Sequence, residues 1–475
     1  MNLLNTVAEK YKNMSTPVKA SFWFTICSIF QKGISFITVP IFTRILSTEE
    51  YGVYSLYLSW QNIISIFATL NLSYQVFNNG MVKYENDQPG YTTAMLGLSN
   101  LSTIIVFGIY FLFHDFINKI TGMDGKYFIL MFFFFIFSTA TSLWTVQQRY
   151  LFRYKALCMV IAFTSVGTSL LGIIFTYNSP TGYSKILADT FITCMVGAGI
   201  YFLLIRKNRN IINTEYWKYA LILDLPLIMH YLSMSVLGSV DRIMINSMCG
   251  SGYTALYSVP YNASMIMKII ISSINASFIP WTYQKCKSKS WTDINKNSTY
   301  ILILVGIMTI IPALFAPELV WLLGSEKYYL SAWIVPPVSC SVFFIFLYSL
   351  FSNIELYFGN SKNIMYASFI TSVVNIVLNY IFINKFGYIA AAYTTLFCYI
   401  LLSVFHYIFM KKTLKNNNTE ATPYNMKIII MLSLVVCIYS IAVGYLYTSH
   451  TLIRYFIILV SVSICAIYFK KHIID

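Results

Sequence analysis

The chain alternates between long apolar runs and short polar connectors. Each run holds about twenty residues of continuous rather than alternating hydrophobicity, which is the length of a membrane-spanning helix. Every backbone amide in a bilayer needs an internal partner, so such runs form helices or closed barrels, and the continuous pattern favours helices. About fourteen runs are present, at 18–42, 51–74, 91–113, 127–144, 156–177, 186–205, 220–245, 254–279, 300–323, 332–358, 364–383, 388–410, 426–447 and 452–469. The pattern predicts an all-α integral membrane protein.

The connectors group these runs into two sets of six and a final pair. We expect an N-terminal lobe at 1–205, a cytoplasmic linker at 206–218, a C-terminal lobe at 219–410, and a further connector with two appended helices at 411–475. A faint repeat supports this division, because Gly52-Val-Tyr-Ser-Leu-Tyr57 opens the second run and Ala255-Leu-Tyr-Ser-Val-Pro-Tyr261 opens the eighth. Copies six spans apart share one orientation, which indicates parallel lobes related by an axis along the membrane normal.

Composition agrees with lipid as the solvent. Hydrophobic residues make up 57% of the chain and charged residues 10%, and the mean hydropathy is +0.66. The net charge of +15 does not indicate a nucleic-acid partner, because the basic residues lie in connectors rather than in a basic arm. Alternate connectors hold about 22 and about seven basic residues, and Lys185 is counted in the smaller, external set. The positive-inside rule therefore predicts that both termini are cytoplasmic.

Several classes of activity have no support in the sequence. No connector exceeds roughly 20 residues, which leaves no room for a soluble catalytic or ATP-binding domain. Gly125-Lys126 lacks the other residues of a Walker A motif. The nine cysteines are scattered singly in apolar runs, without zinc-ligand spacing. We therefore expect no catalytic residues, no metal and no cofactor.

Lysines inside the apolar runs are candidates for function, because a charge in the bilayer is costly. Lys32 lies in the first run and Lys268 in the eighth, each at the centre of a polar stripe with helical spacing. The two stripes consist of Thr25, Ser28 and Ser35 around Lys32, and of Tyr261, Ser264, Ser272 and Asn275 around Lys268. One lysine in each lobe predicts a cationic cavity that binds substrate.

Other polar positions could extend this cavity. Two further polar stripes line either a water-filled interior or hydrogen-bonded contacts between helices. They consist of Ser55, Ser59, Asn62 and Thr69, and of Ser368, Ser372, Asn375 and Asn379. Arg149 and Arg153 follow the fourth run and could meet an anionic head group, with a purely topological role as the alternative. Arg242 belongs to the same candidate substrate set. Alternatively, Asp241 and Arg242 form an interfacial salt bridge or a pair of snorkelling side chains.

Four acidic residues lie within apolar runs: Asp189, Asp224, Asp241 and Glu355. Intramembrane carboxylates serve transporters as ion carriers and also as counter-ions. These four are candidates for coupling to Na⁺ or H⁺, and Asp189 and Glu355 could equally be counter-ions of Lys32 and Lys268. The five histidines show no pairing motif, and we assign them no chemistry.

Three segments carry a resemblance to a known family. They are Val39-Pro-Ile-Phe-Thr-Arg-Ile-Leu-Ser-Thr-Glu-Glu-Tyr-Gly52 after the first run, Asp241-Arg-Ile-Met-Ile with Tyr257-Ser-Val, and Lys385-Phe-Gly-Tyr-Ile-Ala-Ala-Ala392 before the twelfth run. With them the whole chain resembles polysaccharide flippases of the multidrug/oligosaccharidyl-lipid/polysaccharide (MOP) exporter superfamily, particularly the Wzx-type O-antigen flippases. Ala255 and Ala390 stand where glycines are common in that family.

The resemblance implies two six-helix lobes around a central cavity, in a V-shaped fold, with the last two helices outside the core. It also implies transport of an undecaprenyl-diphosphate-linked oligosaccharide, an O-antigen or capsule repeat unit, across the bacterial inner membrane by alternating access. The partners would be this lipid-linked substrate, membrane lipids, Na⁺ or H⁺, and a polysaccharide polymerase with its chain-length regulator. A cationic cavity suits a diphosphate, and the polar stripes suit sugar hydroxyls.

Three alternatives remain. A multidrug exporter of the same superfamily would favour a cavity rich in Asp and Glu, whereas the stripes here centre on lysine. A lipid II exporter would carry several intramembrane arginines, and those of this chain lie mainly at the ends of runs. The third alternative is a membrane-embedded enzyme. A polysaccharide polymerase would have a large external loop, an acyltransferase would have an intramembrane histidine beside other polar residues, and neither pattern is seen.

Overall fold

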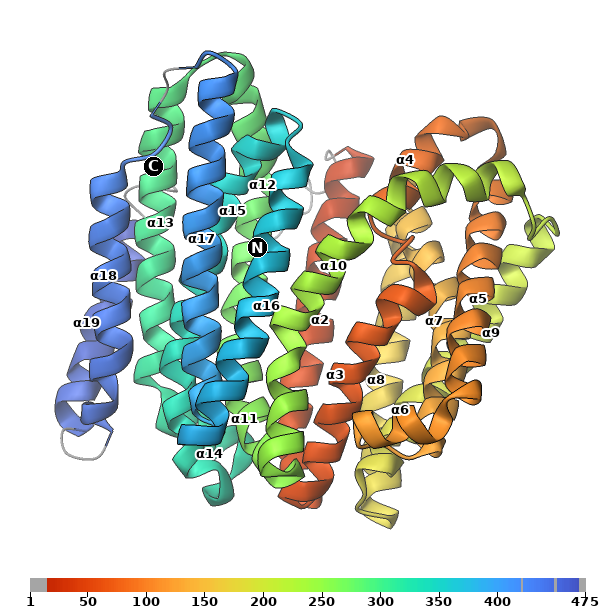
Figure 1. Cartoon of the computed structure of the whole chain (residues 1–475), viewed down its shortest axis with the longest axis horizontal. Coiled ribbons are helices and arrows are strands. Elements are labelled where there is room, and N and C mark those ends of the chain that lie inside the picture. Colours follow the sequence, from red (N-terminus) through yellow and green to blue (C-terminus); the bar gives the residue numbers. More distant parts are fainter. Residues whose placement is uncertain (1–14, 420–421, 448–450, 470–475) are drawn as a thin grey trace, which may run out of the picture. The chain divides into compact units, whose positions relative to one another are not determined.

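The computed structural model describes residues 15–419, 422–447 and 451–469, which form helices joined by short connections (Figure 1). That part of the chain contains no β-strand. The prediction of an all-α, multi-pass membrane protein is confirmed. The chain divides into two compact units, residues 1–228 and residues 229–475.

The first unit is a helical bundle in which α9 is central. It consists of α2 (Thr16–Ile45), α3 (Thr48–Thr69), α4 (Gln75–Lys83), η1 (Glu85–Asp87), α5 (Gln88–Leu112), α6 (His114–Thr121), α7 (Gly125–Tyr150), α8 (Tyr154–Asn178), α9 (Gly182–Lys207) and the first part of α10 (Thr214–Cys249). Helix α9 packs against α3, α7 and α8, and α2 packs against α8. Side-chain caps set several helix starts, since Ser47 accepts a bond from the Glu50 amide and Thr181 from the Ser184 amide.

The second unit is built around α15. Its elements after α10 are α11 (Ser251–Ser264), α12 (Met267–Lys287), α13 (Trp291–Leu314), α14 (Ala316–Gly324), η2 (Glu326–Ile334), α15 (Val335–Tyr357), α16 (Ser361–Phe386), α17 (Ala390–Asn416), α18 (Met426–Ala442), η3 (Val443–Leu446) and α19 (Thr451–Phe469). The span that contains α15 is 89% buried, with α11, α12, α13, α17 and α18 packed against it. A helix that is apolar on all sides is expected at such a centre.

The helices account for each of the expected spans. Ten helices in the described ranges are long and apolar enough to cross a membrane, and two bent pairs, in α10 and in α11 with α12, bring the number to 12. The break in α10 falls between Leu225 and Leu227, where the two parts meet at 53°. The more polar α3 and the short α19 occupy the remaining two windows.

The boundaries of the predicted linker differ from the structure in detail. Helix α9 continues to Lys207 and α10 begins at Thr214, so the connection is shorter than the range 206–218. The appended helices α18 and α19 both pack against α13 of the second unit.

Helix α9 approaches α7 closely because Gly197 has no side chain. A Cβ at this position would lie 2.4 Å from the backbone oxygen of Phe137, and backbone cannot rotate away. We expect Gly197→Ala to lower the free energy of unfolding by roughly 1–3 kcal/mol, which is the usual cost of overpacking. Unfolding in mixed detergent micelles measures this loss.

Gly199 on the same helix is the matched control. A Cβ there meets nothing within 4 Å, so Gly199→Ala should be neutral or stabilise α9 by up to about 1 kcal/mol. Equal effects of the two substitutions would show that helix propensity, and not the approach to α7, determines the result.

Candidate functional site

The Lys32 stripe lies on an exposed face of α2. Lys32, Thr25 and Ser35 are exposed, and Ser28 is half-buried. The three hydroxyl groups each donate to the backbone carbonyl four residues earlier, at 2.9–3.0 Å. The helix therefore satisfies its own hydroxyls, and Lys32 adds a positive charge to that face.

The stripe around Lys268 is divided between two helices. Helices α11 and α12 meet at a 42° bend, where backbone amides bond three residues back instead of four. Tyr261 and Ser264 are buried in α11, whereas Lys268 and Ser272 are exposed on α12. Asn275 is half-buried and donates to a serine hydroxyl of α15 at 3.1 Å. The prediction of one continuous polar face is wrong, because helical spacing does not continue through a break.

Asp241 in α10 is the centre of a buried polar network. Its carboxylate accepts hydrogen bonds from the Tyr257 hydroxyl at 2.6 Å, the Thr395 hydroxyl at 2.6 Å and the Asn379 amide at 2.7 Å. The Asn379 side-chain oxygen in turn accepts a bond from the Thr394 hydroxyl. These donors come from α11, α16 and α17, and all three direct donors to the carboxylate are neutral. Asp241 is therefore a fully buried acid solvated by protein dipoles rather than by a cation.

Arg242 does not form the expected salt bridge with Asp241. Its guanidinium donates to the Gly238 carbonyl at 2.9 Å and to the Asn262 side-chain oxygen at 3.2 Å, and lies 4.3 Å from the centroid of the Tyr261 ring. Consecutive residues of a helix do not face each other, so the two charges point to different partners. Arg242 is also buried, which excludes a snorkelling side chain at the surface.

A buried ion pair occupies the first unit. Lys185, which the charge count assigned to an external connector, lies in α9 and is 6% exposed. Its ammonium is 2.6 Å from Asp189 Oδ1, and Asp189 Oδ2 accepts a bond from the Tyr54 hydroxyl at 3.2 Å. The Phe42 ring lies 4.5 Å from the same ammonium. The structure thus gives Asp189 the counter-ion Lys185, where the sequence suggested Lys32.

Glu355 also has a partner that the sequence did not suggest. Its Oε1 lies 2.7 Å from Nδ1 of His406, and both side chains are fully buried. The sequence suggested Lys268 as a counter-ion of Glu355, and it carries no motif that gives His406 a role. The two residues are 51 positions apart, on α15 and α17, so no local motif could connect them.

The remaining candidates differ in burial. Asp224 is fully buried in the first unit, and neither of its carboxylate oxygens has a hydrogen-bond partner among the described residues. Asn62 on α3 is exposed. Arg149 and Arg153 are exposed at the junction of α7 and α8, with the Arg149 guanidinium 5.8 Å from the ring centroid of Phe24.

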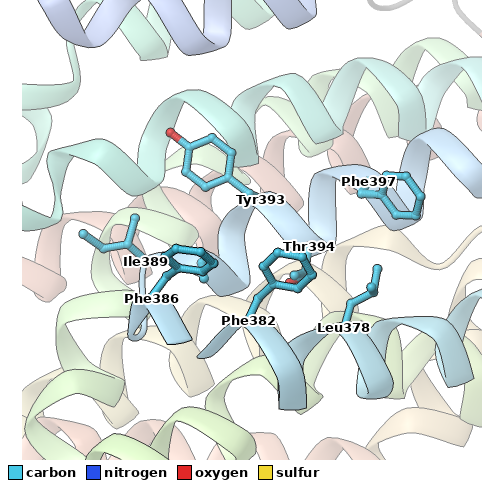
Figure 2. A pocket seen from close by; sticks show the side chains of 8 residues that line it. Leu378, Phe382, Phe386, Ile389, Tyr393, Thr394 and Phe397 are labelled. Carbon is cyan, nitrogen blue, oxygen red and sulfur yellow. The ribbon is translucent and has the colours of Figure 1, made fainter. Parts of the chain in front are cut away.

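An apolar groove of about 650 Å³ lies along α16 and α17 (Figure 2). It is lined by Leu378, Phe382, Phe386, Ile389, Ala390, Tyr393, Thr394 and Phe397. The hydroxyl of Thr394 already donates to the Ala391 carbonyl and to Asn379, so this polar residue is satisfied inside the protein. The groove therefore fits hydrocarbon, and Thr394 connects its wall to the Asp241 network.

Comparison with known proteins places the chain in a family. Residues 18–284 match the model of the polysaccharide biosynthesis protein family, and residues 226–381 match the MatE family. A protein of the Lsg locus of Haemophilus influenzae is 23% identical over 382 residues, which cover 75% of this chain and 88% of that protein.

Solved structures show the same fold. The lipid II flippase MurJ in an inward closed conformation has a TM-score of 0.67 and 15% identity, with 95% of this chain and 99% of that chain covered. A multidrug resistance MATE family transporter of the MOP superfamily, in an inward-facing conformation, has a TM-score of 0.61 and 15% identity, with 85% and 100% covered. Because this family match covers more than half of its length, the chain belongs to the polysaccharide biosynthesis protein family.

Proposed function

We propose that the protein is a flippase for an undecaprenyl-diphosphate-linked oligosaccharide, an O-antigen or capsule repeat unit, in the bacterial inner membrane. The observation that carries the proposal is the family match over residues 18–284 on a transporter fold. Transport proceeds by alternating access, with both termini cytoplasmic as the basic connectors predict. A polymerase and its chain-length regulator would receive the flipped repeat unit.

The polar head of such a substrate needs cations and hydrogen-bond partners. A diphosphate is polyanionic, and Lys32 and Lys268 both present exposed ammonium groups on membrane-spanning helices. In a low-dielectric site these charges would be worth far more than in water. Asn62, Ser272 and the half-buried Ser28 and Asn275 supply polar groups for sugar hydroxyls.

The lipid chain needs an apolar path along the same protein. The groove lies on α16 and α17, two helices long and apolar enough to cross a membrane, and offers hydrocarbon surface with no unsatisfied polar group from Thr394. Its volume of about 650 Å³ lies within the range of roughly 300–1,000 Å³ that is usual for small-molecule sites. A substrate whose head group binds the lysines and whose lipid chain lies in this groove is amphipathic, as a lipid-linked oligosaccharide is.

An ion gradient would drive the cycle, with Na⁺ or H⁺ as the coupling ion. Asp224 and Asp241 are buried carboxylates that form no salt bridge among the described residues, and Asp189 and Glu355 each pair with a titratable side chain. Intramembrane carboxylates of this kind mark ion pathways in transporters.

Lipid II transport is the second candidate function. The fold resembles that of a lipid II flippase over nearly the whole of both chains, and lipid II offers the same combination of diphosphate and polyprenyl chain. Purified protein in proteoliposomes can be offered each lipid separately. If the protein flips lipid II but not repeat-unit lipids, lipid II replaces the proposed substrate. If it flips neither lipid but exports cationic drugs, the protein is a multidrug exporter and not a lipid flippase.

We expect Lys32→Ala and Lys268→Ala each to lower flipping of the repeat-unit lipid by roughly tenfold or more. A hydrogen bond to a charged group contributes about 1.5–3 kcal/mol, and about 1.4 kcal/mol changes a rate tenfold. Arginine at either position keeps the charge and should retain part of the activity. Surface polysaccharide in a complementation assay gives the same readout in cells.

Lys207→Ala is the control, because Lys207 is an exposed basic residue at the end of α9 and outside the stripes. It should leave flipping unchanged. Full activity of both alanine variants at normal expression would remove Lys32 and Lys268 from the substrate site.

A further inference from the structure

The pair formed by Glu355 and His406 is a titratable group inside the membrane-spanning part of the second unit. His406 Nδ1 and Glu355 Oε1 are 2.7 Å apart, and the two side chains are 0–1% exposed. The other carboxylate oxygen, Oε2, is buried without a hydrogen-bond partner in the described residues. A protein interior does not ordinarily leave a charged oxygen in this state, so the pair is costly and calls for a reason.

The charge of the pair depends on a single proton. With the proton shared between Nδ1 and Oε1, the net charge is zero, either as neutral acid and imidazole or as carboxylate and imidazolium. If the proton leaves for water, a carboxylate and a neutral imidazole remain, and the net charge is −1. An unpaired charge of this kind in a low-dielectric interior is strongly unfavourable. The closed packing of α15 on α17 is therefore compatible with the proton-bound pair.

Among residues 15–419, 422–447 and 451–469, Glu355 forms its ion pair with His406 and not with a lysine or arginine. Two described side chains lie near the pair. His230 on α10 hydrogen-bonds Ser368 of α16 at 3.0 Å, and the Tyr348 ring on α15 stacks on His406 with a centroid distance of 5.5 Å. The hydrogen bond and the ion pair of Glu355 both join it to His406 on α17, at 2.7 Å. Loss of the proton would have to be relieved by separating α15 and α17 so that water reaches the carboxylate.

We propose that the Glu355–His406 pair binds and releases the transported proton, and that its occupancy controls the packing of α15 against α17. The coupling ion is then H⁺ and the closed second unit is the proton-bound state, an inference that rests on the proposed flippase function. A ligand that binds one conformation better shifts the population towards it, and here that ligand is the proton.

Two variants separate proton binding from a structural hydrogen bond. Glu355→Gln keeps an oxygen that accepts from Nδ1–H but has no proton to exchange, and His406→Gln removes the imidazole. Ser403→Ala is the matched control, because the buried Ser403 hydroxyl donates to the Phe344 carbonyl at 3.1 Å and so also ties α17 to α15, without a titratable group.

The first measurement is flipping in proteoliposomes with and without a pH gradient. The gradient should stimulate the native protein and the Ser403→Ala variant, and this stimulation should be lost in Glu355→Gln and His406→Gln. Retention of the full stimulation in both pair variants would overturn the proton assignment while the flippase function stands. Failure of the native protein to flip any lipid-linked oligosaccharide would instead remove the proposed function.

The second measurement does not depend on transport. Cys398 on α17 is fully buried, so labelling of its thiol, resolved by mass spectrometry, reports opening of the packing around α17. From about pH 5 to about pH 8, the range in which histidine side chains in general change charge, labelling of the native protein should rise several-fold more than that of Glu355→Gln. Comparison at equal pH cancels ionisation of the thiol itself. Parallel curves would show that the pair is a structural tie only.

Discussion

Lys185→Met is expected to lower the free energy of unfolding by roughly 3 kcal/mol, because it leaves a buried carboxylate without its cation. Removal of one partner of a buried ion pair costs roughly 3–5 kcal/mol, and the lower end applies here since the Asp189 side chain keeps 24% exposure. The Lys185 ammonium also packs on Phe42, so the loss affects the contact between α2 and α9. Unfolding in mixed micelles measures the change.

Two further variants show whether the ion pair itself is responsible. Adding Asp189→Asn to Lys185→Met removes the orphaned charge and keeps an acceptor for Tyr54, so most of the lost stability should return. Lys126→Met breaks an exposed pair with Asp124, at 3.4 Å, and should cost less than about 1 kcal/mol. A loss in Lys185→Met as small as that in Lys126→Met would contradict the buried pair.

Asp241→Asn is expected to reduce flipping by about a hundredfold, which corresponds to roughly 3 kcal/mol in the barrier. The carboxylate of Asp241 is the acceptor for Tyr257, Thr395 and Asn379 at once. An amide in its place cannot accept all three bonds, and it has no charge with which to attract a cation. Flipping measured under a Na⁺ gradient and under an H⁺ gradient should fall in both cases.

The control for Asp241 keeps the carboxylate and removes one donor. Tyr257→Phe deletes a 2.6 Å hydrogen bond but leaves the charge in place, so it should retain far more activity than Asp241→Asn. If both variants lose stability and activity in the same proportion, the network serves only to hold α10, α11, α16 and α17 together.

The acidic residues show what sequence patterns can and cannot predict. That a charge lies inside an apolar run is visible from the sequence, and Asp189, Asp241 and Glu355 were found in this way. Their partners were not found, because the partners come from other helices. Thr395 follows Asp241 by 154 residues, and His406 follows Glu355 by 51. The counter-ions suggested from the sequence, Lys32 and Lys268, are both exposed.

Two errors come from the limits of helical periodicity. Lys185 lies just before an apolar run, so hydropathy assigns it to a connector. In the structure it belongs to the first turn of α9, and its side chain points to Asp189 inside the unit. The stripe from Tyr261 to Asn275 has the right spacing for one face, but a bend after Ser264 turns its two halves to different surroundings. Both features depend on packing with residues far away in the chain.

The sequence by itself determined that lipid is the solvent, that the chain forms about fourteen spanning helices, and that charges and hydroxyls lie within them. Those properties are local, since apolar length and backbone hydrogen bonding decide them. Only the tertiary structure decided which charge pairs with which, whether Asp241 and Arg242 meet, and where α16 and α17 leave an apolar groove. Hydrogen bonds and ion pairs depend on distances of about 3 Å, and packing between distant helices sets such distances.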